Sequence, residues 1–96
     1  MNVEIFPYKG IMFFIIEGKI NRKNISKLVE TNEFILKMGI NNIVFNLLNT
    51  NVNKRVINIL KQNYKITSNV YFVNKKNYKG IINLENDLNV FKYIKV

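Results

Sequence analysis

The chain of 96 residues contains no cysteine and no histidine. Without cysteine there are no disulfide bonds, and without either residue there is no Cys- or His-based metal site. Ser-His and Cys-His nucleophile pairs and histidine acid–base catalysis are excluded for the same reason. Only one aspartate and five glutamates are available for carboxylate chemistry. We therefore expect a protein that is not an enzyme and that uses no metal and no cofactor.

The chain also lacks long apolar runs, and it has only one proline and four isolated glycines. The apolar stretch at residues 10–16 is far shorter than the roughly 20 residues that a bilayer-spanning helix needs. The start, Met-Asn-Val-Glu, has no positive charge and no small-residue cleavage site follows it, so a secretory signal is not indicated. No glycine-rich phosphate loop is present. We expect one domain over residues 1–96, located in the cytoplasm and not inserted in a membrane.

Positive charge dominates, with 15 Lys+Arg against 6 Asp+Glu and a net charge of +9. Residues 1–48 carry six basic and four acidic side chains, whereas residues 49–96 carry nine and two. A basic half indicates an acidic protein, a nucleic acid or an anionic surface as partner. The alternative is compositional bias, because Asn, Ile and Lys supply 46 of the 96 residues and alanine is absent.

Apolar periodicity predicts alternating strands and helices in the first half. Residues 3–6 form a weak edge strand that ends at Pro7, and residues 11–16 form a strand apolar on both faces. Asn21 is a helix N-cap candidate, and Gly39 is placed to close the same helix in a left-handed conformation. Its apolar stripe is predicted to contain the following residues: Ile25, Leu28, Val29, Asn32, Ile35 and Leu36.

The second half continues the alternation. Residues 43–48 read as a buried strand, and a second helical stripe is predicted at Val52, Val56, Ile59, Leu60 and Asn63. Residues 70–73 form a short strand, residues 77–84 a brief helix, and residues 90–96 a last strand. The predicted fold is α/β: a mixed, mostly parallel five-stranded sheet with an antiparallel first edge strand and about three helices, packed mainly on one face.

These segments resemble a STAS domain, the fold of bacterial anti-sigma factor antagonists. Residues 15–21 are similar to that family's strand ending in glycine before its first helix, and residues 40–47 to its central strand. Residues 70–73 and 88–94 resemble its closing part. The resemblance implies a protein-interaction module that acts in transcription regulation, with an anti-sigma factor or a histidine-kinase-like ATPase as partner. Some such modules instead serve as accessory subunits of membrane transporters, which is the first alternative.

The chain departs from the family where helix two begins. Regulatory members carry there a Ser or Thr that the partner kinase phosphorylates, whereas no Ser or Thr lies between Asn51 and Leu60 of this chain. We therefore expect a degenerate module that works without phosphorylation. Its predicted partner-binding residues are the loop and the start of helix two: Thr50, Asn51, Val52, Asn53, Lys54 and Arg55. The alternative is that Lys54 and Arg55 are only solvated surface.

Two further expectations concern the surface. Family members usually add a C-terminal helix that this chain lacks, so one sheet face is expected to be bare or used in a homo-oligomer. The less favoured alternative function is nucleic-acid binding by the basic half, although no recognition motif is present. It would use these residues: Lys54, Arg55, Lys61, Lys65, Lys75, Lys76 and Lys79.

Overall fold

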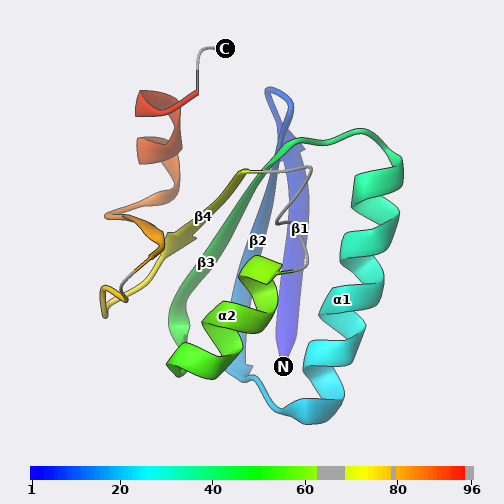
Figure 1. Ribbon diagram of the computed structural model, residues 1–96, viewed down its shortest axis with the longest axis vertical. Helices are drawn as coiled ribbons and strands as arrows, with labels where there is room; N and C mark the ends of the chain where they lie inside the picture. The colour runs from blue at the N-terminus through cyan, green and yellow to red at the C-terminus, as the bar shows by residue number, and fades with distance from the viewer. Residues whose placement is uncertain (63–68, 79, 95–96) are drawn as a thin grey trace.

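The structure is a computed structural model that describes residues 1–62, 69–78 and 80–94, without the side chains of Arg22, Val29, Asn32 and Leu36 (Figure 1). One five-stranded sheet has the spatial order β1-β2-β3-β4-β5. The first pair is antiparallel and the other three pairs are parallel, as predicted. The strands are β1 (Asn2–Tyr8), β2 (Ile11–Lys19), β3 (Asn42–Asn51), β4 (Asn69–Val73) and β5 (Ile82–Leu84).

A two-residue turn joins β1 to β2. Lys9 and Gly10 both have positive φ angles, 49° and 76°, which is the geometry of a type I′ hairpin turn. The flanking residues Tyr8 and Ile11 then form a hydrogen-bonded pair, so Pro7 opposite Met12 falls in a pair without ladder hydrogen bonds. The nitrogen of Pro7 therefore faces the outer edge of the sheet. Proline has no N–H, but at this position the backbone would not have donated a hydrogen bond to β2.

Helices α1 (Arg22–Lys37) and α2 (Lys54–Gln62) cover one face of the sheet, here called the helix face (Figure 1). Their buried side chains meet alternate residues of the central strands in one apolar cluster. Ile57 of α2 is fully buried, although the predicted stripe omitted it; the stripe also included Asn63, which lies outside the described residues. The buried members of this cluster are Met12, Phe14, Ile16, Ile20, Ile25, Leu28, Ile35, Ile43, Phe45, Leu47, Ile57, Leu60 and Phe72.

The ends of α1 follow the predicted caps. The side-chain oxygen of Asn21 accepts hydrogen bonds from the backbone N–H groups of Lys23 and Asn24, at 3.0 and 3.1 Å. The side chain of Asn24 in turn accepts from the N–H of Asn21 at 2.7 Å, so two unpaired donors are satisfied reciprocally. Gly39 has φ 77° just beyond the helix, and Lys37 lies in the last turn, where a cation is favourable.

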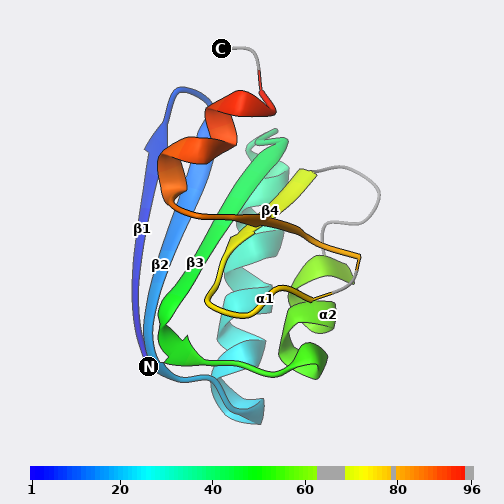
Figure 2. The same ribbon diagram turned by 90° about the vertical axis from the view of Figure 1, so that its left-hand side faces the viewer.

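The opposite face is covered by a 3₁₀ helix, η1 (Asp87–Lys92), and is called the η1 face (Figure 2). Val90 is fully buried there against alternate residues of β2, β3 and β4, with Phe91 and Ile94 packed at the rim of the cluster. Burial raises the pKa of Tyr71 above its ordinary value, and the neighbouring Tyr93 adds to the effect. The buried members are Ile11, Phe13, Val44, Tyr71, Val73, Leu84 and Val90.

The closing segments correct the prediction in type and order. Residues 77–84 are not a helix: within them β5 pairs in parallel with β4. The described part of residues 90–96 is not a strand but belongs to η1 and the turn after it. The spacing i, i+1 and i+4 of the apolar residues Val90, Phe91 and Ile94 places them on one side of a helix. In a strand, successive side chains point to opposite faces, so Phe91 would point away from Val90. The face expected to be bare is therefore covered by η1 and Ile94.

Aromatic contacts join the hairpin tip to η1. The rings of Tyr8 and Phe91 meet edge to face, with centroids 6.0 Å apart. The ammonium group of Lys9 lies 5.5 Å from the Tyr8 ring centre and 5.6 Å from that of Phe91. Such a cation over two rings adds on the order of 0.5–1 kcal/mol at an exposed site. The first hairpin and the last helical turns of the chain thus stabilise each other.

The N-cap of α1 gives a test of local stability. Asn21→Ala leaves two backbone donors without their acceptor and is expected to lower the free energy of unfolding by about 1 kcal/mol in urea denaturation followed by circular dichroism. Asn58→Ala, at an exposed position within α2, is the matched control and should change it by less than about 0.5 kcal/mol. Equal midpoints for Asn21→Ala and wild type would contradict the capping role.

The packing of η1 gives a second test. Val90 is 0% exposed and Leu88, two residues earlier, is 67% exposed. Val90→Ala removes two buried methyl groups and is expected to destabilise the protein by about 2 kcal/mol. Leu88→Ala removes more carbon from a solvated position and should have an effect below about 0.5 kcal/mol. If thermal denaturation ranks the two variants the other way, η1 does not cover the sheet as described.

Candidate binding site at the carboxyl edge of the sheet

The carboxyl ends of β2, β3 and β4 meet at one edge of the sheet, seen at the bottom of Figure 1 for β2 and β3. In open sheets of parallel strands, ligands bind outside this edge, where each strand leaves the sheet for a helix. The predicted partner-binding loop, residues 50–55, lies there because it connects β3 to α2. We call residues 50–55 the docking loop.

A β-bulge near the end of β3 changes the direction in which the strand enters the docking loop. Ile15 pairs with Asn46 but Glu17 pairs with Asn49, so β3 contains one residue more than β2 over this stretch. The side-chain oxygen of Asn46 accepts a hydrogen bond from the N–H of Leu48 within the bulge, at 3.2 Å. The amide nitrogen of Asn46 donates to Asp87 of η1, also at 3.2 Å. The shape of β3 before the loop is therefore coupled to the position of η1.

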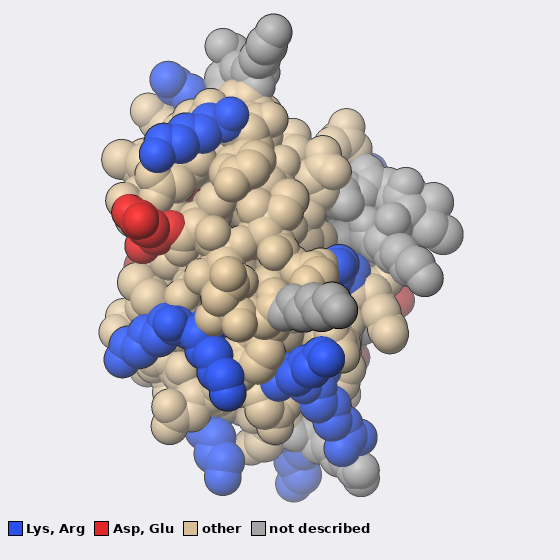
Figure 3. All heavy atoms as spheres, turned by 60° about the vertical axis from the view of Figure 1, so that its left-hand side comes forward, with Lys and Arg blue, Asp and Glu red and all other residues tan. Residues whose placement is uncertain are grey.

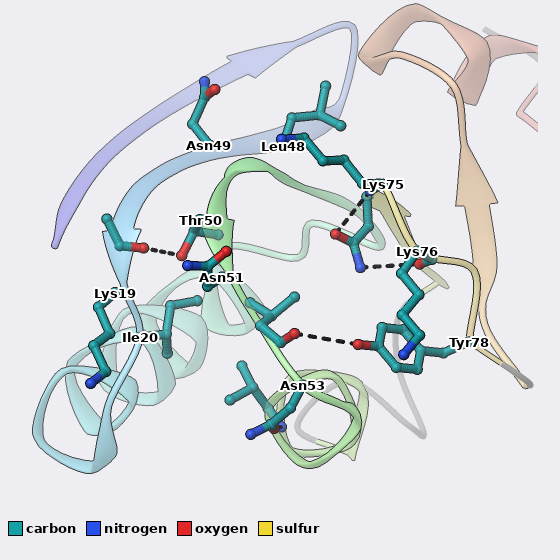
Figure 4. A pocket seen from close by; sticks show the side chains of 14 residues that line it. Lys19, Ile20, Leu48, Asn49, Thr50, Asn51, Asn53, Lys75, Lys76 and Tyr78 are labelled. Carbon is teal, nitrogen blue, oxygen red and sulfur yellow. Dashed lines mark hydrogen bonds between the residues drawn. The ribbon is translucent and has the colours of Figure 1, made fainter.

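The hydroxyl of Thr50 is part of the sheet edge. It donates a hydrogen bond to the backbone carbonyl of Gly18 at the end of β2, as the dashed line in Figure 4 shows. Thr50 is the only hydroxyl residue of the docking loop, since no Ser or Thr lies between Asn51 and Leu60. The hydroxyl of Thr50 thus holds the ends of β2 and β3 together. In the sequence, Thr50 precedes the position at which the resemblance would place a phosphorylated residue.

Helix α2 starts with two cations. The backbone carbonyl of Asn53 accepts from the N–H of Ile57 at 3.2 Å, and its side chain accepts from the N–H of Val56 at 3.0 Å, which makes Asn53 the N-cap. Lys54 and Arg55 follow in the first turn and are exposed. Positive charge opposes the helix dipole there by about 0.3–1 kcal/mol. An anionic group bound beside this turn would be favoured by both the charges and the free N–H groups.

An open pocket of about 960 Å³, the carboxyl-edge pocket, lies beside the docking loop (Figure 4). It is formed by the ends of β2 and β3, the start of α2 and the segment after β4. The hydroxyl of Tyr78 donates a hydrogen bond to the carbonyl of Val52 at 3.3 Å and so connects that segment to the docking loop. The lining residues are Gly18, Lys19, Ile20, Leu48, Asn49, Thr50, Asn51, Val52, Asn53, Val56, Asn74, Lys75, Lys76 and Tyr78.

The charged side chains that line the pocket have one sign. Among the described residues, the lining of the pocket includes three lysines and no aspartate or glutamate. Lys19 comes from the end of β2, and Lys75 and Lys76 follow β4; Figure 4 shows them on opposite sides of Thr50 and Asn51. In Figure 3, Lys and Arg side chains gather over the lower part of the face in view, which is the end of the molecule where the carboxyl edge lies.

Four of the six predicted residues line the pocket, together with residues from other segments. Thr50, Val52 and Asn53 line the pocket with Asn51, whereas Lys54 and Arg55 lie just outside the lining. Of the three lysines in the lining, Lys75 and Lys76 were grouped with the loop only in the nucleic-acid alternative, and Lys19 was in no predicted site. Each of them follows the end of a predicted parallel strand by two or three residues, and because the carboxyl ends of parallel strands share one edge, this signal could have placed all three beside the loop.

The structure places five of the seven basic residues considered for nucleic-acid binding. Lys54, Arg55, Lys75 and Lys76 lie at the carboxyl edge, but the side chain of Lys61 donates to the backbone carbonyl of Gly80. Lys65 and Lys79 lie outside the described residues.

Other candidate sites are sparse in the described part of the chain. Within it, no three Asp or Glu side chains come together as metal ligands. Glu30 and Glu33 are both exposed on α1. None of the described helices has the length and apolar content to cross a bilayer.

A scan against protein-family models and a search of the curated proteins find no match to this chain.

The hydroxyl of Thr50 gives a test of the site's architecture. Thr50→Val keeps the shape of the side chain but removes its donor to Gly18, and should lower the free energy of unfolding by about 1 kcal/mol. Thr50→Ser keeps the donor and should be closer to wild type. If chemical denaturation shows both variants unchanged, the hydroxyl does not hold β2 to β3 at this edge.

Proposed function

We propose that the protein is a non-catalytic interaction module, similar to an anti-sigma factor antagonist, that binds an acidic surface of a protein partner without being phosphorylated. The docking loop and the first turn of α2 form the contact. One observation carries the proposal: α2 begins with two exposed cations, Lys54 and Arg55, and has no Ser or Thr in its first turn that a kinase could phosphorylate.

The electrostatics of the docking loop support an acidic partner. Lys54 and Arg55 are exposed, and the first turn of α2 holds no acidic side chain to compensate them. The α2 dipole adds partial positive charge at the same place. A carboxylate of a partner would relieve this unfavourable arrangement, and it would also accelerate association by attraction at a distance.

The chemistry of the loop supports binding that is not switched by a kinase. Phosphorylation at a helix start would add about −1.5 to −2 charge and three acceptor oxygens, which would reverse the sign of this site. Here the hydroxyl of Thr50 is already bonded to the end of β2, and the next six residues offer no other. The site keeps a positive charge, so its affinity for an acidic partner is constitutive.

The fold suits this role because it holds the loop on a rigid base. The docking loop follows a strand buried on both faces, and its position is fixed by the bulge at Asn46 and by the Asn53 cap. A preorganised loop loses little conformational entropy on binding. The resemblance implies an anti-sigma factor or a histidine-kinase-like ATPase as partner, and the identity of the bound protein separates this from a transporter subunit.

Charge reversal at the docking loop tests the proposal. The immobilised wild-type chain should recover a protein partner from an extract of its source cells, with recovery that falls as salt rises. Lys54→Glu with Arg55→Glu is expected to reduce recovery at least tenfold, since it replaces two attractive charges by two repulsive ones. Lys37→Glu with Lys92→Glu, in the last turns of α1 and η1, makes the same net change away from the loop.

The outcomes separate the alternatives. Equal recovery by the loop variant and the control variant would contradict docking through residues 50–55. Recovery that nuclease treatment abolishes would instead favour the nucleic-acid alternative. Circular dichroism of both double variants serves as the control for folding.

A further inference from the structure

The carboxyl-edge pocket combines an apolar base with a cationic rim. Ile20 is buried beside it, and the side chains of Leu48, Val52, Val56 and Tyr78 are half-buried around it. The other lining side chains are mostly lysines and amides, so an apolar base lies beside a polar, cationic rim, and the volume of about 960 Å³ falls within the range of about 300–1,000 Å³ of small-molecule sites. A flat protein-docking surface does not require such a hollow.

Three lysines and two asparagines around the pocket can donate hydrogen bonds to an anion. In the described structure, the ammonium groups of Lys19 and Lys75 have no hydrogen-bond or ion-pair partner, and that of Lys76 lies 5.5 Å from the ring centre of Tyr78. Asn49 and Asn51 line the pocket with side chains likewise unbonded there. Asn74 is different, because its oxygen accepts from the N–H of Lys75 and its nitrogen donates to the carbonyl of Lys76, which shapes the rim.

We infer that the carboxyl-edge pocket binds a small organic anion with an apolar body, a carboxylate or phosphate monoester carrying an aliphatic chain. The anionic head lies among Lys19, Lys75 and Lys76, and the chain packs on Val52, Val56 and Tyr78. A cation is disfavoured because none of the described lining residues is acidic. A bare inorganic anion would leave the apolar base in contact with water.

The inference makes two quantitative demands. Each methylene buried adds about 0.8 kcal/mol, so affinity should rise about two- to fourfold per carbon from butanoate to octanoate. Each lysine contributes through a partly solvated contact, so its loss should weaken binding about two- to fivefold. Loss of all three lysines should weaken binding at least tenfold.

Binding of octanoate to the full chain tests the inference. Amide nitrogen–proton NMR spectra recorded during a titration should show shifts at Gly18, Thr50 and Val56 around the pocket. Octylammonium has the same chain with the opposite charge and should not shift these amides, and acetate should bind at least tenfold more weakly than octanoate. Octyl phosphate is the second arm, and the tighter of the two anions identifies the preferred head group.

Lysine variants complete the design. The single variants Lys19→Gln, Lys75→Gln and Lys76→Gln and their triple combination keep the side chains polar and should fold normally. Lys37→Gln, an exposed lysine at the far end of α1, is the matched control and should bind octanoate as wild type does.

Three results would overturn the inference: octylammonium binding as tightly as octanoate, an unchanged affinity in the folded triple variant, or shifts confined to residues outside the pocket. None of them affects partner docking through Lys54 and Arg55, because these two residues lie outside the lining and are tested by their own variants.

Discussion

The three central strands are apolar on both faces, and this property determines how the rest of the chain is arranged. Phe14 and Phe45 face α1 and α2, while their neighbours Phe13 and Val44 face the other way, and all four are essentially excluded from water. Both faces must therefore be covered. Two helices are available for one face, and the last residues of the described chain, around Val90, supply the cover for the other.

The long elements could be predicted from the sequence because their signals are local. The apolar run at residues 11–16, the cap at Asn21 and the stop at Gly39 each contain their own physical reason. The closing part could not be read in this way. β5 has only three residues, and it forms because β4 offers an unpaired edge. Val90 and Ile94 fit both a strand and a helix by pattern, and the need to cover the η1 face favours the helix.

The candidate site shows a similar division between local and distant information. Residues 50–55 form one continuous segment to which the resemblance points, whereas Lys19 and Lys75 join them only through the parallel register of β2, β3 and β4. Beside the bulge that precedes the loop, Asn46 donates a hydrogen bond to Asp87, which is 41 residues away in the sequence. No spacing rule within one segment predicts such a contact, because the two residues belong to separate elements, β3 and η1.

The nitrogen of Pro7, which faces outward from β1, has a consequence for how this protein can meet others. The outer edge of β1 has three positions whose N–H groups could pair with another strand, at Val3, Ile5 and Pro7, and Pro7 has no N–H to donate. The opposite edge strand of the sheet, β5, is only three residues long. Neither border is a good template for edge-to-edge growth into fibrils or swapped dimers. The carboxyl ends of the strands, by contrast, present side chains rather than an open row of backbone groups.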